Sequence, residues 1–306
     1  MLHAYQQFFE ILVTANRPCL STTHTTHMKK QLSSLTLALA LTTASHAVTM
    51  FDIVIDFGSS TFTTSQQAAF TNAEATWESL ITSYKTTGVT TGTTLTISAN
   101  NPIIDGAGGT LGSAGPSTGN SFGGSYLYAT TGAMNFDSAD VAALETAGTW
   151  EAVILHEMAH VIGIGTLWSS SGAGIPGFQE LYVDGSGQYT GATGLAAYQQ
   201  EFVGQESATF VPVELGGGAG TANGHWNEGD GGFATGITRV SDGQDMSLML
   251  MSGWLNPSSY ISDTTLGSFE DLGYNTTLVL ASVPEPSSVS LLAAGILGLG
   301  FRRCRR

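Results

Sequence analysis

Two histidines and a glutamate at helical spacing are the residues of this chain best suited to chemistry. His156, Glu157 and His160 form the pattern H-E-x-x-H. Residues four apart lie on one face of a helix, so both imidazoles can reach one metal ion. The glutamate beside the first histidine then lies at the edge of that ion, where it can take a proton from bound water. The pattern predicts a zinc site with hydrolytic chemistry.

A count of the other histidines points to a third ligand. The chain has seven histidines, and four of them precede residue 48, in a segment that we expect to be lost on export. Between residues 48 and 282 the sequence keeps His156, His160 and His225. A catalytic zinc ion takes three protein ligands and leaves one position open. His225 is therefore the expected third ligand, unless a carboxylate fills that place.

The residues around the motif resemble the metzincin metalloproteases. Gly163 extends the pattern to H-E-x-x-H-x-x-G, and a glycine there permits a sharp turn. Most metzincins place the third histidine six residues after the second, where this chain has Thr166. The leishmanolysins resemble this chain better, because a long insertion separates their glycine from the third histidine. Residues 224–228 (GHWNE), with His225, are similar to their third-ligand segment.

A second segment strengthens the resemblance. Residues 250–256 (LMSGWLN) are similar to the metzincin methionine turn, with Met251 as the turn residue, although Met246 and Met249 lie close by. Residues 268–274 (SFEDLGY) resemble the end of leishmanolysin-like bacterial domains. The resemblance covers about 135–275 and is diffuse over 48–134. Unlike the leishmanolysins, this chain has no cysteine between 48 and 282. The segment between the expected cleavage site and the first predicted strand is also too short for a propeptide.

The resemblance implies a fold and an activity. It implies an α+β, two-lobed zinc protease domain with the active-site helix at the base of the cleft. It also implies a secreted zinc-dependent metalloendopeptidase that acts on a polypeptide substrate, with zinc on His156, His160 and His225. Glu157 is the expected general base toward the zinc-bound water. Tyr260 follows the methionine turn, where some metzincins place an assisting tyrosine; a packing role is the alternative.

Two other functions fit the same motif. The first is a non-catalytic cell-surface or matrix module, associated with exopolysaccharide and built on a metzincin-like domain. The intact Glu157 argues against this function, because a binding module would lose nothing without that residue. The second is a zinc hydrolase with a non-protein substrate, such as a peptidoglycan amidase.

The elements that must position these residues follow from hydrophobic patterning. Residues 150–162 (WEAVILHEMAHVI) are apolar on nearly every face, which predicts a buried helix that ends at Gly163 and Gly165. Strands are predicted over 51–57, 93–98 and 126–129, and helices over 65–85, 138–147 and 264–274. Turns are expected over 104–124, and irregular structure over 169–235.

The N-terminus carries the features of an export signal. Residues 28–30 (MKK) form a short basic start, 35–41 (LTLALAL) are apolar, and 44–47 (ASHA) provide a small-residue cleavage site. We expect a signal peptide over 28–47, cleaved after Ala47. Residues 1–27 fit no part of a signal and are expected to be a mis-called leader; a long n-region or a cytoplasmic arm are the alternatives.

The C-terminus, residues 283–306, resembles a PEP-CTERM sorting tail. Residues 284–286 read Pro-Glu-Pro, 289–301 are apolar, and four arginines follow. The apolar run is short for a permanent anchor, which needs about 20 residues; an ordinary anchor is nevertheless the alternative. The resemblance implies removal by an exosortase and transient membrane contact through the tail. It also implies export to the cell envelope, cell surface or extracellular matrix of a Gram-negative bacterium.

The charge balance excludes a nucleic-acid partner. The chain has 9 basic and 24 acidic residues, and residues 48–282 keep Lys85 and Arg239 against 22 acids, a net charge of −20. Phosphate backbones need lysine and arginine contacts. The runs 227–231 (NEGDG) and 242–245 (DGQD) could bind calcium through clustered oxygen ligands. Solvated acidic turns are the other interpretation of these runs.

Overall fold

The computed structural model describes residues 51–86, 94–169, 179–229 and 231–281. These residues belong to one unit of the chain, Ala47–Arg306, and they form a mixed α/β structure with small sheets. The predicted leader (1–27), signal peptide (28–47) and sorting tail (283–306) lie outside the described residues. Within the described residues, no helix has the length and apolar character needed to cross a membrane.

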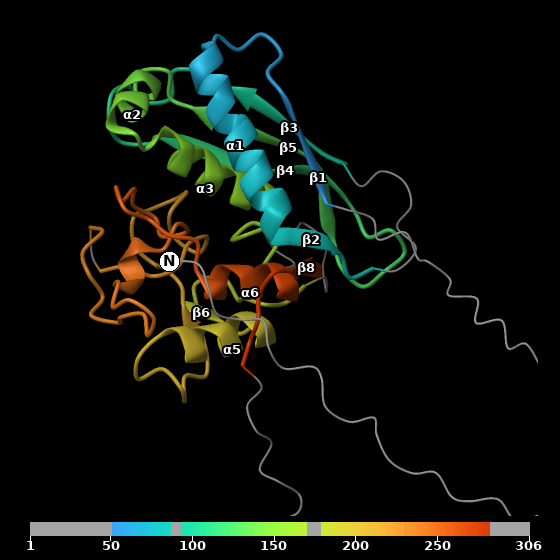
Figure 1. The fold of residues 1–306 in the computed structure, drawn as a ribbon, viewed down its shortest axis with the longest axis vertical. Helices are drawn as coiled ribbons and strands as arrows, with labels where there is room; N and C mark the ends of the chain where they lie inside the picture. The colour runs from blue at the N-terminus through green and yellow to red at the C-terminus, as the bar shows by residue number, and fades with distance from the viewer. Residues whose placement is uncertain (1–50, 87–93, 170–178, 230, 282–306) are drawn as a thin grey trace, which may run out of the picture. The chain divides into compact units, whose positions relative to one another are not determined.

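A four-stranded sheet forms one layer (Figure 1). Its strand order is β1 (Asp52–Asp56), β3 (Thr94–Asn100), β5 (Tyr128–Phe136) and β4 (Gly112–Asn120). The first three strands are mutually parallel, and β4 runs antiparallel to β5 at the edge. Alternate residues of β3, which are Leu95, Ile97 and Ala99, are fully buried, as expected of a strand with one face on the core.

Two long helices lie side by side against this sheet (Figure 1). The first is α1 (Thr64–Leu80), which begins with a capping box between Thr63 and Gln66. The second is α3 (Trp150–Ile162), and the short α2 (Val141–Ala147) precedes it. The indole of Trp77 on α1 donates to the backbone oxygen of Leu155 on α3 at 3.1 Å. This buried hydrogen bond fixes the two helices against each other.

The later part of the chain packs around two antiparallel helices, α5 (Ala192–Glu201) and α6 (Asp263–Asp271). The remaining elements are short: β2 (Ile81–Tyr84) pairs with β8 (Tyr274–Thr276), β6 (Gln188–Tyr189) pairs with β7 (Val211–Pro212), and a 3-10 turn, η1, spans Met246–Leu248. The pairing of β2 with β8 joins the end of this part of the chain to the end of α1.

Each of the helices α5 and α6 ends in a carboxylate that caps the other helix. Glu201 accepts hydrogen bonds from the first amides of α6, including the Thr264 N–H at 2.9 Å. Asp271 accepts from the Thr193 and Gly194 N–H groups at the start of α5, both at 2.8 Å. The helices also touch through glycine, since a Cβ on Gly267 would lie 2.8 Å from the Gly194 Cα. These reciprocal caps satisfy amides that a helix start leaves unpaired.

Several sequence predictions are wrong in detail. The helix expected to reach residue 85 ends at Leu80, because Ile81 and the next residues pair with β8 instead. The turns expected over 104–124 include the nine-residue strand β4. Its sequence (GSAGPSTGN) has no apolar alternation, so its pairing with β5 determines the strand. The irregular region expected over 169–235 contains the helix α5.

Other predictions are confirmed. The buried helix over 150–162 is α3, with the same ends. The strands predicted at 51–57 and 93–98 correspond to β1 and β3, while the strand predicted at 126–129 continues to Phe136 as β5. The helix predicted at 138–147 is α2, which begins at Val141. The two-lobed metzincin-like arrangement stays a prediction.

Candidate metal centre

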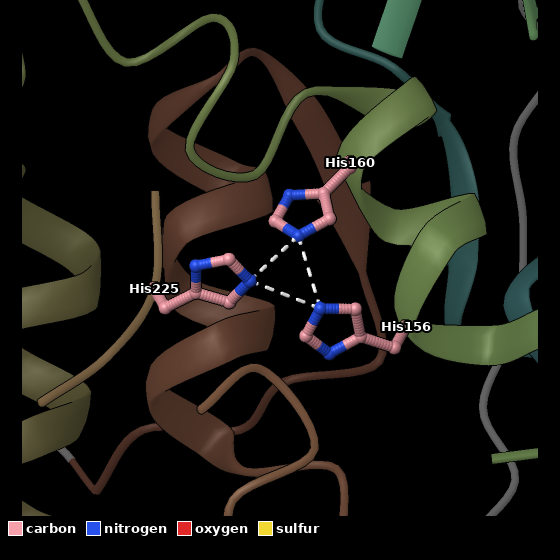
Figure 2. Close-up of side chains that lie close together, drawn as sticks. All are labelled: His156, His160 and His225. Atoms are coloured by element: carbon pink, nitrogen blue, oxygen red, sulfur yellow. Dashed lines mark hydrogen bonds between the residues drawn. The ribbon is translucent and has the colours of Figure 1, made fainter. Parts of the chain in front are cut away.

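Three histidines point toward one another (Figure 2), and all three line one cleft. His156 and His160 lie one turn apart on α3, and His225 comes from the segment between β7 and η1. Their Nε2 atoms form a triangle with sides of 3.0, 3.0 and 3.1 Å. Among the residues that the structure describes, this is the one group of histidine, cysteine and acidic side chains close enough to share a metal ion.

Backbone carbonyls determine which ring nitrogen carries the proton. Each Nδ1 lies beside a carbonyl oxygen: that of Leu250 at 2.7 Å for His156, Ile164 at 2.9 Å for His160, and Thr221 at 2.8 Å for His225. A carbonyl can only accept, so each Nδ1 carries the proton and each Nε2 presents a lone pair in the neutral ring. Three lone pairs therefore point at one another. A bound cation satisfies all three at once, and metal-bound histidines commonly donate their other nitrogen to a carbonyl.

The triangle has the dimensions of a zinc site. Zinc–nitrogen bonds of about 2.0–2.1 Å in a tetrahedral site separate neighbouring nitrogens by about 3.3 Å. The observed separations of 3.0–3.1 Å are close to this value. The three histidines therefore fit a zinc ion. His156, His160 and His225 would hold the ion, and such a three-ligand zinc ion would supply Lewis acidity in the cleft.

Burial keeps all three imidazoles neutral. Burial first, and the nearby His156 second, lower the pKa of His225 to about 3. The pKa of His160 lies well below its usual range because of burial and the two neighbouring histidines. Burial also lowers the pKa of His156. The neutral imidazole is the form that binds a metal ion.

Glu157 follows His156 on α3 and lies at the same cleft. Its side chain is only 6% exposed, and burial raises the pKa of the carboxyl to about 8. A divalent cation beside it would favour the carboxylate and oppose this rise. The edge strand β4 passes over it at Gly112, where a Cβ would lie 2.8 Å from the Glu157 Oε1. A side chain at this position would therefore displace the Glu157 carboxylate.

The cleft has a volume of about 820 Å³ and walls of small residues. Its lining includes the segment 109–114, which contains the start of β4, and residues of the glycine-rich segment 217–225. Residues of the 250–256 segment close one end, and Trp254 is the largest side chain there. Glu157 is the one charged side chain among the lining residues.

A close glycine contact brings the third histidine to α3. Gly163 ends α3, and Gly165 follows with a φ of +72°. A Cβ on Gly165 would overlap the carbonyl oxygen of Gly224, the residue before His225. Thr166, at the position where most metzincins carry their third ligand, donates to the His160 carbonyl at 2.6 Å. The Gly165–Gly224 contact therefore brings His225, rather than Thr166, to His160.

The segment predicted as a methionine turn contacts both ligand-bearing segments. The Leu250 carbonyl accepts from His156, as described above, and the Met251 carbonyl accepts the Trp226 N–H at 2.9 Å. The Met251 side chain is fully buried. This segment thus holds His156 and the residue after His225 in one hydrogen-bonded arrangement.

The structure does not bring the other predicted residues to the cleft. The guanidinium of Arg239 lies over the ring of Tyr260, with its Cζ 3.9 Å from the ring centre. Tyr260 is not among the cleft-lining residues. Asp242 binds the same arginine, and Asp245 accepts from backbone N–H groups that include Ser247 at 2.9 Å. Protein donors therefore occupy the carboxylates of the predicted calcium run 242–245. In the run 227–231, residue 230 lies outside the described part of the chain.

Sequence reasoning missed the groups that orient the ligands. The carbonyls of Leu250, Ile164 and Thr221 set the three ring tautomers, but every residue type has a carbonyl, so no sequence signal marks them. Gly112 was hidden in a segment expected to be turns. The glycine next to the predicted ligand, Gly224, was the one available signal of a close approach.

Comparison with known protein families gives one match, at the C-terminus. The PEP-CTERM protein-sorting motif matches residues 282–306. The motif indicates export and cell-surface sorting in Gram-negative bacteria, and processing by an exosortase-type enzyme. Comparison with curated proteins gives no match. The leishmanolysin-like assignment of the domain therefore stays a prediction.

Proposed function

We propose that this chain is a secreted zinc metalloendopeptidase of a leishmanolysin-like metzincin type. The observation that carries the proposal is the set of three Nε2 lone pairs within 3.1 Å of one another, with Glu157 beside them in an open cleft. Two of these ligands lie on one helix and the third lies 65 residues further along. A purely structural histidine cluster would not need an acid next to it at the cleft.

The residues of the chain divide the chemical work. When bound, a zinc ion supplies Lewis acidity and makes a water molecule acidic enough to react near neutral pH. Glu157 takes the proton of the attacking water as its oxygen bonds to the scissile carbonyl carbon. The carbon–nitrogen bond then breaks, and Glu157 gives that proton to the leaving amine. One group can serve both steps because Glu157 lines the same cleft as the three histidines.

The edge strand supports a polypeptide substrate. β4 pairs with β5 on one side only, and residues 112–114 line the cleft. An unpaired strand edge binds an extended peptide through main-chain hydrogen bonds. Gly112 lies against the Glu157 carboxylate, so a peptide paired with this strand edge would lie next to Glu157.

The sorting motif supports a site of action outside the cell. A chain that is exported and sorted to the cell surface meets surface and matrix proteins rather than cytoplasmic ones. We propose that the substrates are polypeptides of the cell envelope or extracellular matrix. Contact with the membrane is transient and ends when the tail is processed.

Metal content and proteolysis, measured together on the full-length chain, test the proposal. We expect one zinc ion per chain by mass spectrometry, together with casein hydrolysis. His225→Ala should lose both. Glu157→Gln should keep the zinc ion and lose activity by about 10²–10⁴-fold. The matched control is Glu151→Gln, the same change on the same helix, which should leave both unchanged.

Each contrary outcome has a distinct meaning. If His225→Ala retains the zinc ion of the wild-type chain, another residue completes the site and the leishmanolysin-like assignment fails. If zinc binds normally but casein is not cleaved, the protease proposal fails, and the chain is either a non-catalytic surface module or a zinc hydrolase with a non-protein substrate. Activity retained in zinc-loaded Glu157→Gln would exclude Glu157 as the base.

A further inference from the structure

Two tryptophans stack between the segments that carry the histidine ligands. Trp168 ends the turn that follows His160, and Trp226 directly follows His225. Their ring centres are 4.7 Å apart with an angle of 35° between the ring planes, and both side chains are fully buried. The pair therefore connects the exit of α3 with the remote ligand.

Both indoles donate to hydroxyls on one face of α6. The Trp226 Nε1 donates to the Thr265 Oγ1 at 2.9 Å, and the Trp168 Nε1 donates to the Ser268 Oγ at 2.9 Å. Residues three apart on a helix lie on the same face. Thr265 and Ser268 are both fully buried, so each indole N–H depends on its hydroxyl partner.

We propose that Thr265 and Ser268 are positioning residues for the metal centre. They hold the two tryptophans in register and thereby set the separation between His160 and His225. The affinity for the metal ion is then controlled from a helix that contributes no ligand. This inference deepens the proposed function, since it rests on the zinc site described there.

The segment around His225 explains why such a device is needed. It has no regular secondary structure, and residues 217–224 include Gly217, Gly218 and Gly220, all with positive φ. A glycine-rich segment loses much conformational freedom when it is fixed. Trp226 is the best-anchored residue next to the ligand, through its ring, its N–H bond to Met251 and its hydrogen bond to α6. Loss of the hydrogen bond to α6 should therefore let Trp226, and His225 beside it, move.

Thr265→Val tests the proposal, because it keeps the shape of the side chain and removes the acceptor of the Trp226 N–H. Thr264→Val is the matched control, because it makes the same change at the preceding, equally buried residue. It breaks a 2.7 Å hydrogen bond to Glu201 and none to a tryptophan. The full-length chain is stripped of metal, and the zinc dissociation constant is measured by competition with a chelator. Urea unfolding of the metal-free chain is measured in parallel.

We expect Thr265→Val to raise the zinc dissociation constant by about 10–100-fold, the usual effect of removing a group that orients a metal ligand. Ser268→Ala should raise it less, because Trp168 is further from a ligand. Thr264→Val should change it by less than about twofold while destabilising the metal-free chain as much. Thr265→Ser, which keeps the hydroxyl, should restore tight binding. Trp226→Phe should match Thr265→Val, and the double variant should lose little more.

Two results overturn the inference. In the first, folded Thr265→Val binds zinc as tightly as the wild type. In the second, Thr264→Val weakens zinc binding equally, which would assign the effect to α6 stability in general. The proposed function can fail separately. If the wild-type chain binds zinc and the variants show the expected pattern, but casein is not cleaved, this inference is supported and the protease function is excluded. If the wild-type chain binds no zinc, both the inference and the proposed function are excluded.

Discussion

His156 and His160 lie on a helix that the sequence specifies by itself, whereas His225 lies on a segment held from outside. α3 is apolar, buried against the sheet and tied to α1 through Trp77. The segment of His225 has only isolated bridges, which join Trp226 to Val213 and to Ser252. Local spacing therefore positions two ligands, and many distant contacts position the third. The site should therefore be more sensitive to substitutions that affect the segment of His225 than to those that affect α3.

The glycine contact between these two regions gives the most severe way to break the site. Gly165→Ala places a Cβ against the Gly224 carbonyl and also strains a backbone with φ of +72°. We expect a loss of about 1–2 kcal/mol from the backbone conformation and a further 1–3 kcal/mol from the overlap. Urea unfolding and zinc content measure the effect. Loss of zinc should accompany the loss of stability, because His225 follows Gly224.

Gly148→Ala is the matched control for that change. Gly148 has a φ of +73°, nearly the same as Gly165, but a Cβ there would meet nothing within 4 Å. It should show only the backbone cost of about 1–2 kcal/mol and keep its zinc ion. Equal effects of the two substitutions would mean that the Gly165–Gly224 contact does not hold the third ligand.

A change on the α3 side sharpens the comparison, because it should affect activity and not metal content. Gly112→Ala places a Cβ 2.8 Å from the Glu157 Oε1. A small displacement of a reacting group costs about 100-fold in rate. We expect kcat/KM for a peptide substrate to fall by about that factor while one zinc ion stays bound. In Gly115→Ala, on the same strand, the new Cβ lies 3.8 Å from its nearest neighbour and should leave activity unchanged.

A pH dependence of stability is expected on the side of the third ligand. The pKa of His225 in the folded chain, about 3, lies below the ordinary value of 6.5. Between these pH values the unfolded chain binds a proton that the folded chain does not, so the free energy of unfolding falls as the pH falls through this window. The slope is about 1.4 kcal/mol per pH unit for each such histidine.

Urea unfolding of the metal-free chain between pH 7 and pH 4 measures this slope. His160 and His156 add to it, because their pKa values are lowered as well. His225→Gln removes one titrating group and should reduce the slope by about 1.4 kcal/mol per pH unit. An unchanged slope in this variant would show that His225 is not buried in the folded metal-free chain.

The same contrast explains how much could be predicted from the sequence. The apolar run 150–162 predicted α3 with its ends, and helical spacing put His156 and His160 on one face. His225 was found by a count of histidines and by resemblance, not by geometry. β4 was missed because glycine, serine and threonine carry no apolar period, so the neighbouring strand decides its conformation. The carbonyls that orient the rings were missed because every residue has one.

The reciprocal caps on α5 and α6 have a consequence for cooperativity. Fraying of the first turn of α6 would leave the Glu201 carboxylate buried without its amide donors, and fraying of α5 would do the same to Asp271. Neither helix can open at these ends alone without stranding a charge that belongs to the other. The two first turns should therefore exchange their amide hydrogens as one unit.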